Sequence, residues 1–174
     1  MKTLKHELKK EEPIKWFLMG LIPILNLYFL WKVTQLLSGH KKEKAHLIHR
    51  DEIKSTTKWF TIIILPLISV ISLILTLSIQ GGIIFYLNAI ITITISAYTL
   101  WKISELISGH EKRSTGYETI KHNSKMGPTL SWVVYGIVPG LNLYFLWRLA
   151  TIITEHSIIT NKKELLQEPK QNNT

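Results

Sequence analysis

Residues 27–40 read LYFLWKVTQLLSGH, an apolar segment with Tyr, Trp and Lys near its start and a Gly-His pair at its end. A close copy, AYTLWKISELISGH, occupies residues 97–110, and a looser copy, LYFLWRLATIITEH, occupies residues 143–156. Upstream of each copy another Trp precedes a Pro by seven residues; the pairs are Trp16/Pro23, Trp59/Pro66 and Trp132/Pro139. This recurrence predicts three internal repeats, at about 16–40, 59–110 and 132–156, within one membrane domain of 174 residues.

The middle repeat contains the longest apolar segment of the chain. No Asp, Glu, Lys, Arg or His occurs from Trp59 to Trp101, and the apolar run is interrupted at Gln80, Gly81 and Gly82. A run of about 18 or more apolar residues predicts a membrane-spanning helix. Residues 59–79 and 83–101 are therefore a predicted transmembrane hairpin, with its turn at Gly81 and Gly82.

The outer repeats are too short for the same hairpin, because their two Trp residues are 15 positions apart and those of the middle repeat are 42 apart. A helix from Trp16 to Pro23 descends only about 10 Å, and Pro interrupts a helix. We expect each outer repeat to reverse there, at Pro23 and Asn26 in the first and at Pro139 and Asn142 in the third. The predicted fold is all-α and integral to the membrane: one full transmembrane helical hairpin flanked by two short re-entrant, half-depth helical hairpins.

The distribution of basic residues favours this arrangement over the alternative, a bundle of four spanning helices. Eighteen Lys and Arg residues lie in the flanks of the repeats. Four spans would divide them eight against ten, whereas re-entrant repeats place all of them on one side. Cytoplasmic segments are enriched in Lys and Arg, so we predict a multi-pass cell-membrane protein with both termini cytoplasmic. Its polar flanks (1–15, 41–58, 111–131 and 157–174) and its net charge of +9 predict contact with anionic headgroups.

Aromatic and basic residues recur where each repeat would cross the headgroup layer. Trp and Tyr concentrate at this layer in membrane proteins, and long basic side chains reach out to it. A Tyr precedes the second Trp of every repeat by three residues, and a base follows that Trp directly. The predicted interface residues are Trp16, Trp31, Lys32, Trp59, Trp101, Lys102, Trp132, Trp147 and Arg148.

One His stands nine residues after the second Trp of every repeat: His40, His110 and His156. If the three repeats pack around a common centre, these side chains could converge and bind a metal ion through imidazole nitrogen. The alternative is that each His caps the last carbonyls of its own helix and faces the headgroups. The spacing of His46 and His49 predicts a solvated helical face with no metal signature.

Three Asn residues lie within the apolar segments: Asn26, Asn88 and Asn142. Buried amides in a membrane can line a solute path, which would suit a small transporter or channel component. They can equally close the backbone of a turn, since hydrocarbon leaves no polar group to water. From helix rise we also expect Asn26 and Asn142 to contact hydroxyl groups of the central hairpin at their own depth.

Several chemistries are absent from the sequence. The chain has no Cys, which excludes disulfides, thiolate nucleophiles and Cys-bound metal clusters. It contains no nucleophile–base arrangement, no pair of carboxylates in a cleft and no glycine-rich phosphate loop. Its basic residues alternate with acidic ones and form no stripe for nucleic acid. We predict a protein that is not an enzyme, has no cofactor and does not bind nucleic acid.

The pattern P-x-L-N-L-Y-x-L-W-[KR], at residues 23–32 and 139–148, resembles segments of small prokaryotic, mainly archaeal, integral membrane proteins of unknown function. That resemblance implies membrane insertion and no catalytic residue. The leading hypothesis is a structural or accessory membrane protein, either a wedge that shapes the bilayer or a subunit of a homo-oligomer or larger membrane complex. A transporter or channel component and a metal-binding membrane protein are the alternatives.

Overall fold

The computed structural model describes residues 3–6, 13–43, 46–50, 53, 56–79, 82–110, 122–123 and 126–159. Six helices dominate this part of the chain: α1 (Pro13–Leu21), α2 (Pro23–Gly39), α3 (Thr56–Ile79), α4 (Ile83–Gly109), α5 (Met126–Ile137) and α6 (Leu141–Thr154). Five short strands accompany them: β1 (Thr3–His6), β2 (His40–Glu43), β3 (His46–His49), β4 (His122–Asn123) and β5 (His156–Ile159). The all-α prediction therefore missed the strands, which form because the polar segments pair with each other beyond the helix ends.

The two predicted spans are confirmed as long apolar helices. An 18-residue window within residues 56–78 of α3 has a mean hydropathy of 2.7 and one within residues 83–109 of α4 a mean of 1.8, and both helices are long enough to cross a bilayer. α3 continues through Pro66 without a break. The predicted turn at Gly82 precedes α4 directly, with an extended backbone at φ 167°; Gly81 lies outside the described residues.

The helices on either side of Pro23 and of Pro139 reverse direction sharply. The rings of Trp16 and Tyr28 stack with centroids 5.7 Å apart, although 12 residues of straight helix would separate them by about 18 Å. Trp132 and Tyr144, also 12 residues apart, stack at 5.5 Å. The axes of α5 and α6 differ by 119°. Two helices of the described chain, α3 and α4, are long and apolar enough to cross a membrane. If the bent α5–α6 pair is counted as one span, there are three such segments.

The turns sit slightly earlier than the sequence predicts. In the first pair the reversal occurs at Ile22, and Pro23 is already the first residue of α2, a position where its missing N–H costs nothing. Asn26 lies inside the first turn of that helix. In the third pair the turn covers residues 138–140, where Gly140 adopts φ +87°, a conformation that favours glycine. Asn142 likewise lies in the first turn of α6.

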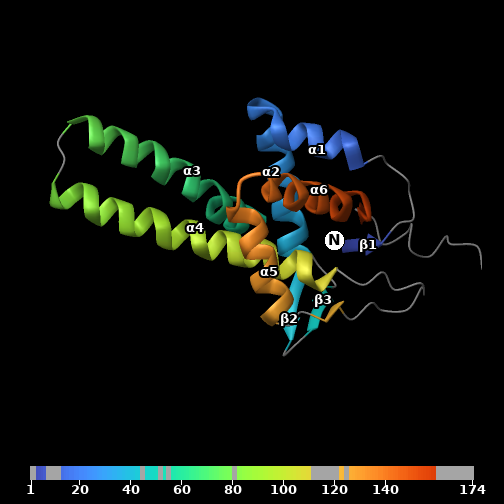
Figure 1. Ribbon diagram of the computed structural model, residues 1–174. Helices are drawn as coiled ribbons and strands as arrows, with labels where there is room; N and C mark the ends of the chain where they lie inside the picture. The colour runs from blue at the N-terminus through green and yellow to red at the C-terminus, as the bar shows by residue number, and fades with distance from the viewer. Residues whose placement is uncertain are drawn as a thin grey trace, which may run out of the picture.

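The three helix pairs are arranged in a closed ring. α1 packs on α6, α3 packs on α2 and α5 packs on α4, while the second helices of the pairs, α2, α4 and α6, also touch one another. Their facing side chains form the core, in which Val33, Ile107 and Ile152 are fully buried. Figure 1 shows that α3 and α4 project far beyond this ring, on the side away from β2 and β3.

The junctions of the ring use small residues and hydroxyl pairs. Gly20 of α1 lies against Leu146 of α6, and Gly136 of α5 lies against Leu100 of α4; a Cβ at either glycine would come within 2.8 Å or 2.5 Å of a leucine methyl. Ser108 and Thr129 share a 2.9 Å hydrogen bond across the α4–α5 junction. Close helix contact thus depends on residues that leave room for the neighbour.

The strands gather at the C-terminal ends of α2, α4 and α6. β2 and β3 form a hairpin in which His40 is paired with His49, and β4 adds to its edge. β1 pairs antiparallel with β5, so the segment that precedes α1 lies beside the segment that follows α6. The ring therefore has one polar, strand-bearing end and one apolar end from which the long hairpin projects.

Candidate metal centre

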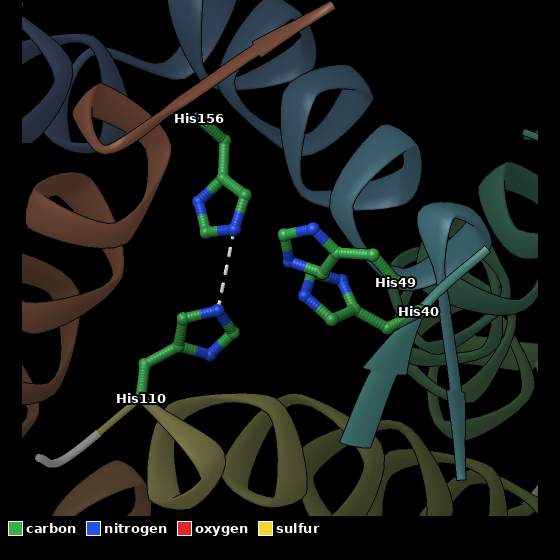
Figure 2. A group of neighbouring side chains, drawn as sticks. All are labelled: His40, His49, His110 and His156. Atoms are coloured by element: carbon green, nitrogen blue, oxygen red, sulfur yellow. Dashed lines mark hydrogen bonds between the residues drawn. The ribbon is translucent and has the colours of Figure 1, made fainter. Parts of the chain in front are cut away.

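Four His side chains meet at the strand-bearing end of the ring: His40, His49, His110 and His156. One ring nitrogen from each lies within 4.8 Å of one from every other. Figure 2 shows the four rings turned toward a common point, with His40 and His49 side by side and His110 opposite His156. The structure thus brings together all three His residues that the sequence singles out. It also adds a fourth.

Three of these side chains are positioned by the same device. His40 and His110 directly follow α2 and α4, and His156 comes two residues after α6. The Nδ1 atom of each bonds to the carbonyl four residues earlier, namely that of Leu36, Leu106 or Ile152, at 2.6, 2.7 and 2.7 Å. The two readings of the sequence are therefore compatible, because each His caps its own helix through Nδ1 while its Nε2 is directed elsewhere.

These capping bonds select one tautomer. A carbonyl oxygen accepts only, so Nδ1 must carry the hydrogen and donate it. In a neutral imidazole the hydrogen on Nδ1 leaves Nε2 with its lone pair, which is the form that ligates a metal. Backbone carbonyls hold metal-binding His residues in this way in many proteins, and they also raise the basicity of the ligand. In all three residues the capping bond therefore sets the tautomer in which Nε2 can ligate a metal.

The prediction that His49 lies on a solvated helical face is wrong. This residue ends β3, directly opposite His40 in the β2–β3 register, and its ring centroid lies 4.6 Å from that of His40. The next residue, Arg50, anchors the strand: its N–H donates to the Gly39 carbonyl at 2.7 Å and its Nε to the His40 carbonyl at 3.2 Å. The available signal was a pair of His residues flanking an eight-residue segment, a length that allows a hairpin.

The one nitrogen–nitrogen distance resolved within the group, that between His110 and His156, fits a small tetrahedral ion. The Nε2 atoms of His110 and His156 are 3.3 Å apart. Zn²⁺–N bonds of about 2.0–2.1 Å at tetrahedral angles place neighbouring ligand atoms about 3.3–3.4 Å apart. His40 and His110 are almost fully buried, and His49 and His156 are half-buried. Four imidazoles without a carboxylate or thiolate suit Zn²⁺, Cu²⁺ or Ni²⁺ and disfavour Mg²⁺ and Ca²⁺.

The ends of the helices make this point favourable for a cation. The C-terminus of a helix carries about half a negative charge, and a nearby positive charge is stabilised there. α2, α4 and α6 all direct this end toward the His group. Arg148 of α6 donates through Nη2 to the carbonyl of His110, so a base that the sequence assigned to the headgroup layer ties α6 to the end of α4.

The predicted interface residues occupy different environments. The rings of Trp16 and Trp132 are buried in the ring of helices, at 6% and 4% exposure, whereas Trp147 is 38% exposed. Trp31, Trp59 and Trp101 are half-buried. The Nζ atom of Lys32 lies 5.8 Å from the Trp16 ring centroid, and that of Lys102 forms a 3.1 Å ion pair with Glu105. Their position relative to a bilayer stays a prediction.

The three Asn residues do not share one environment. Asn26 donates to the Gly20 carbonyl at 2.7 Å and so closes the turn between α1 and α2. The expectation that Asn26 would contact a hydroxyl of the central hairpin is wrong. Because α1 ends beside Gly20, the Gly20 carbonyl has no donor within that helix, and the Asn26 amide supplies one. Asn88 instead bonds within the central hairpin, to Ser72 and Thr76. Asn142 is exposed at the start of α6.

Comparisons with known proteins give no further information. No protein-family model matches this chain, and neither curated proteins nor solved structures yielded a match. The metal site is therefore inferred from the geometry of the four His side chains.

Proposed function

We propose that this protein is a non-enzymatic integral membrane protein that binds one divalent transition-metal ion, best fitted by Zn²⁺, through His40, His49, His110 and His156. The observation that carries the proposal is that one nitrogen of each imidazole lies within 4.8 Å of one from every other, although the residues come from three helix ends and one strand. Apolar helices long enough to span a bilayer support the membrane assignment.

The ligand number supports a structural role for the metal. Catalytic zinc sites use three protein ligands and keep one position for water or substrate, whereas structural sites are closed by four. Four His residues would close this site. The ion would then join the ends of α2, α4 and α6 and the β2–β3 hairpin, which are otherwise held at this end of the molecule by the side chains of the ring.

The same cluster supports the one-sided topology. If the four apolar segments all crossed the membrane, His156 would be separated from His40 and His110 by about 30 Å of hydrocarbon. The proximity of their rings argues against that arrangement. The pairing of β1 with β5 extends the argument to the first helix pair, because it keeps the chain before α1 at the same end. We therefore infer that α1–α2 and α5–α6 enter and leave on one face, and that only α3 and α4 cross.

This topology makes a membrane-shaping or accessory role the best-supported physiological function. The bends expose large apolar side chains, among them Ile24 at 81% and Ile137 at 65%, which would contact the acyl chains of one leaflet. Two half-depth pairs beside one spanning hairpin occupy more volume in that leaflet than in the other. The excess of Lys and Arg over acidic residues in the flanks would attract the strand-bearing face of the protein to anionic headgroups on the cytoplasmic side.

Metal analysis of the purified protein tests the site. Protein produced with zinc in the medium should carry about one ion per chain, and Co²⁺ substitution should give the intense visible absorption of a tetrahedral ion. His110→Ala and His49→Ala should each reduce the metal content, while Lys41→Ala, next to His40 in β2, serves as the control. Metal content that is unchanged in a variant lacking all four His residues would refute the proposal.

Cysteine accessibility tests the topology, because the native chain has no Cys. A single Cys at the exposed position Lys41 should be labelled only from the cytoplasmic side of sealed vesicles, and one at the exposed position Gly82 only from the other side. A Cys at Asn142 in the α5–α6 pair should resist membrane-impermeant reagents from both sides. Labelling of Asn142→Cys from the side that labels Gly82→Cys would show that the third pair crosses the membrane.

Vesicle size tests the wedge. Reconstitution at increasing protein-to-lipid ratio should shrink or tubulate vesicles, whereas the same mass of a symmetric helical hairpin should leave them unchanged. An unaltered size distribution at high loading would eliminate the membrane-shaping role and leave the metal site untouched.

A further inference from the structure

We propose that two copies of this chain associate in the membrane through a polar cluster on the projecting part of α3 and α4, formed by Ser72, Thr76 and Asn88. This inference is independent of the metal site, which lies at the opposite end of the molecule. The Nδ2 group of Asn88 donates to Ser72 Oγ at 3.0 Å and to Thr76 Oγ1 at 3.1 Å. The cluster therefore joins the two helices on one side of the hairpin.

The depth of the cluster makes its exposure costly. Ser72 follows Trp59 by 13 residues, and Asn88 precedes Trp101 by the same number, so both lie about 20 Å along their helices. From the headgroup layer this distance ends well inside a hydrocarbon core of about 30 Å. Ser72 is nevertheless exposed and Asn88 half-buried. Around them Ile71, Leu75 and other large apolar side chains are more than half exposed, so the cluster is a polar island on a lipid-facing surface.

The hydrogen bonds of the cluster leave one donor and one acceptor over. Asn88 uses both amide hydrogens, but within the described residues nothing donates to its Oδ1. The Thr76 hydroxyl donates to the backbone carbonyls of Ser72 and Leu73. The Ser72 hydroxyl accepts from Asn88, and no acceptor for its own hydrogen occurs in the described part of the chain. In hydrocarbon, neither group can turn to water instead.

A second copy supplies what is missing. In a two-fold symmetric contact the same patch faces itself, so each donor meets the partner's acceptor. The Ser72 hydroxyl of one copy would donate to Asn88 Oδ1 of the other, and the reverse bond would form by symmetry. Polar side chains of this kind promote association of membrane helices. Several other exposed hydroxyls of the hairpin donate to a carbonyl of their own helix; that of Thr94, for instance, donates to the Ile90 carbonyl at 2.8 Å.

Disulfide cross-linking in lipid vesicles tests the pairing, since the native chain contributes no Cys. Leu75→Cys lies on the face of the cluster, one turn from Ser72, and Ile74→Cys lies on the opposite face of α3; both positions are exposed. Cross-linking should be efficient at position 75 and weak at position 74. Adding Asn88→Leu should weaken dimerisation about tenfold, because the two symmetric bonds are lost, whereas Thr94→Val should leave it unchanged.

Three outcomes would overturn the proposal: equal cross-linking at positions 74 and 75, a dimer that persists in the Asn88→Leu variant, or a chain that stays monomeric at every protein-to-lipid ratio. Helix content and thermal unfolding of the Asn88→Leu variant in detergent show whether it is folded. Where this variant does not fold, Ser72→Ala removes the unpaired donor together with one of the two acceptors of Asn88, keeps Asn88 bonded to Thr76, and should still reduce cross-linking at position 75.

Discussion

The two ends of the central hairpin contain the same kinds of residues in opposite environments. Near the ring, Ile107 of α4 is fully buried among α2, α4 and α6. At the projecting end, Ile83 and Ile84 of the same helix are 76% and 66% exposed. Hydropathy alone does not separate these positions, because a protein core and a lipid tail are equally apolar solvents for Ile. The difference shows that only part of the apolar sequence specifies protein packing, and that the rest remains exposed on helices long and apolar enough to span a membrane.

Metal removal should produce the largest contrast between the two ends. Ligand binding stabilises a folded state by about 4 kcal/mol when the free metal exceeds its dissociation constant about a thousandfold. Chelation should therefore increase hydrogen exchange strongly at the C-terminal ends of α2, α4 and α6. The projecting ends of α3 and α4 should exchange as before. A uniform increase along the whole chain would mean that the ring and the hairpin unfold together.

The next largest contrast is expected when one Ile side chain is shortened at each end of the central hairpin. Ile107→Ala should lower the free energy of unfolding in detergent by about 2–5 kcal/mol, because it opens a cavity among three helices. Ile83→Ala should change it very little, since detergent or lipid fills the space around an exposed side chain. Thermal unfolding followed by circular dichroism measures both, and similar losses would contradict the distinction between the two ends.

A smaller contrast is expected at two glycines. Gly136→Leu should destabilise the α4–α5 junction by about 1–3 kcal/mol, because its side chain would overlap Leu100 of α4. Gly82→Leu is the matched control: no atom lies within 4 Å of its added Cβ, and its extended backbone accepts any residue. Restored stability in the double variant Gly136→Leu with Leu100→Ala would identify the overlap as the cause.

The smallest effect concerns one hydroxyl pair. Ser108→Ala removes the 2.9 Å bond to Thr129 across the α4–α5 junction and should cost about 1 kcal/mol. Ser78→Ala at the other end of the hairpin removes only a bond to the carbonyl of its own helix at Ile74 and should be neutral. Denaturant midpoints of the two variants should therefore differ, with the Ser108 variant lower.

The sequence predicted the long apolar hairpin and the two sharp reversals, because these depend on local properties. A charge-free run of 43 residues needs a membrane or a core, and Pro at a fixed place in a short apolar segment limits the helix before it. The turn positions were off by one to three residues. Asn26 was placed at a tip although it begins a helix, because Pro is as well suited to a first helical position as to a turn.

The candidate site was predicted in part. Recurrence at a constant distance from Trp identified His40, His110 and His156, since a repeated helix of constant length ends at a constant place. His49 was missed because its position depends on strand pairing with His40, and such pairing forms between segments whose sequences carry little signal of their own. The burial of Trp16 and Trp132 was missed for a related reason, because an amphipathic ring suits a headgroup layer and a helix junction equally well.

Neighbouring residues alone specify which segments are apolar, where the helices end and which residue types stand at those ends. The closure of the helix pairs into a ring and the convergence of the four imidazoles depend instead on tertiary contacts. Ring closure depends on contacts between residues more than 120 positions apart, such as Gly20 with Leu146, and no local pattern encodes the shape of a partner so distant along the chain.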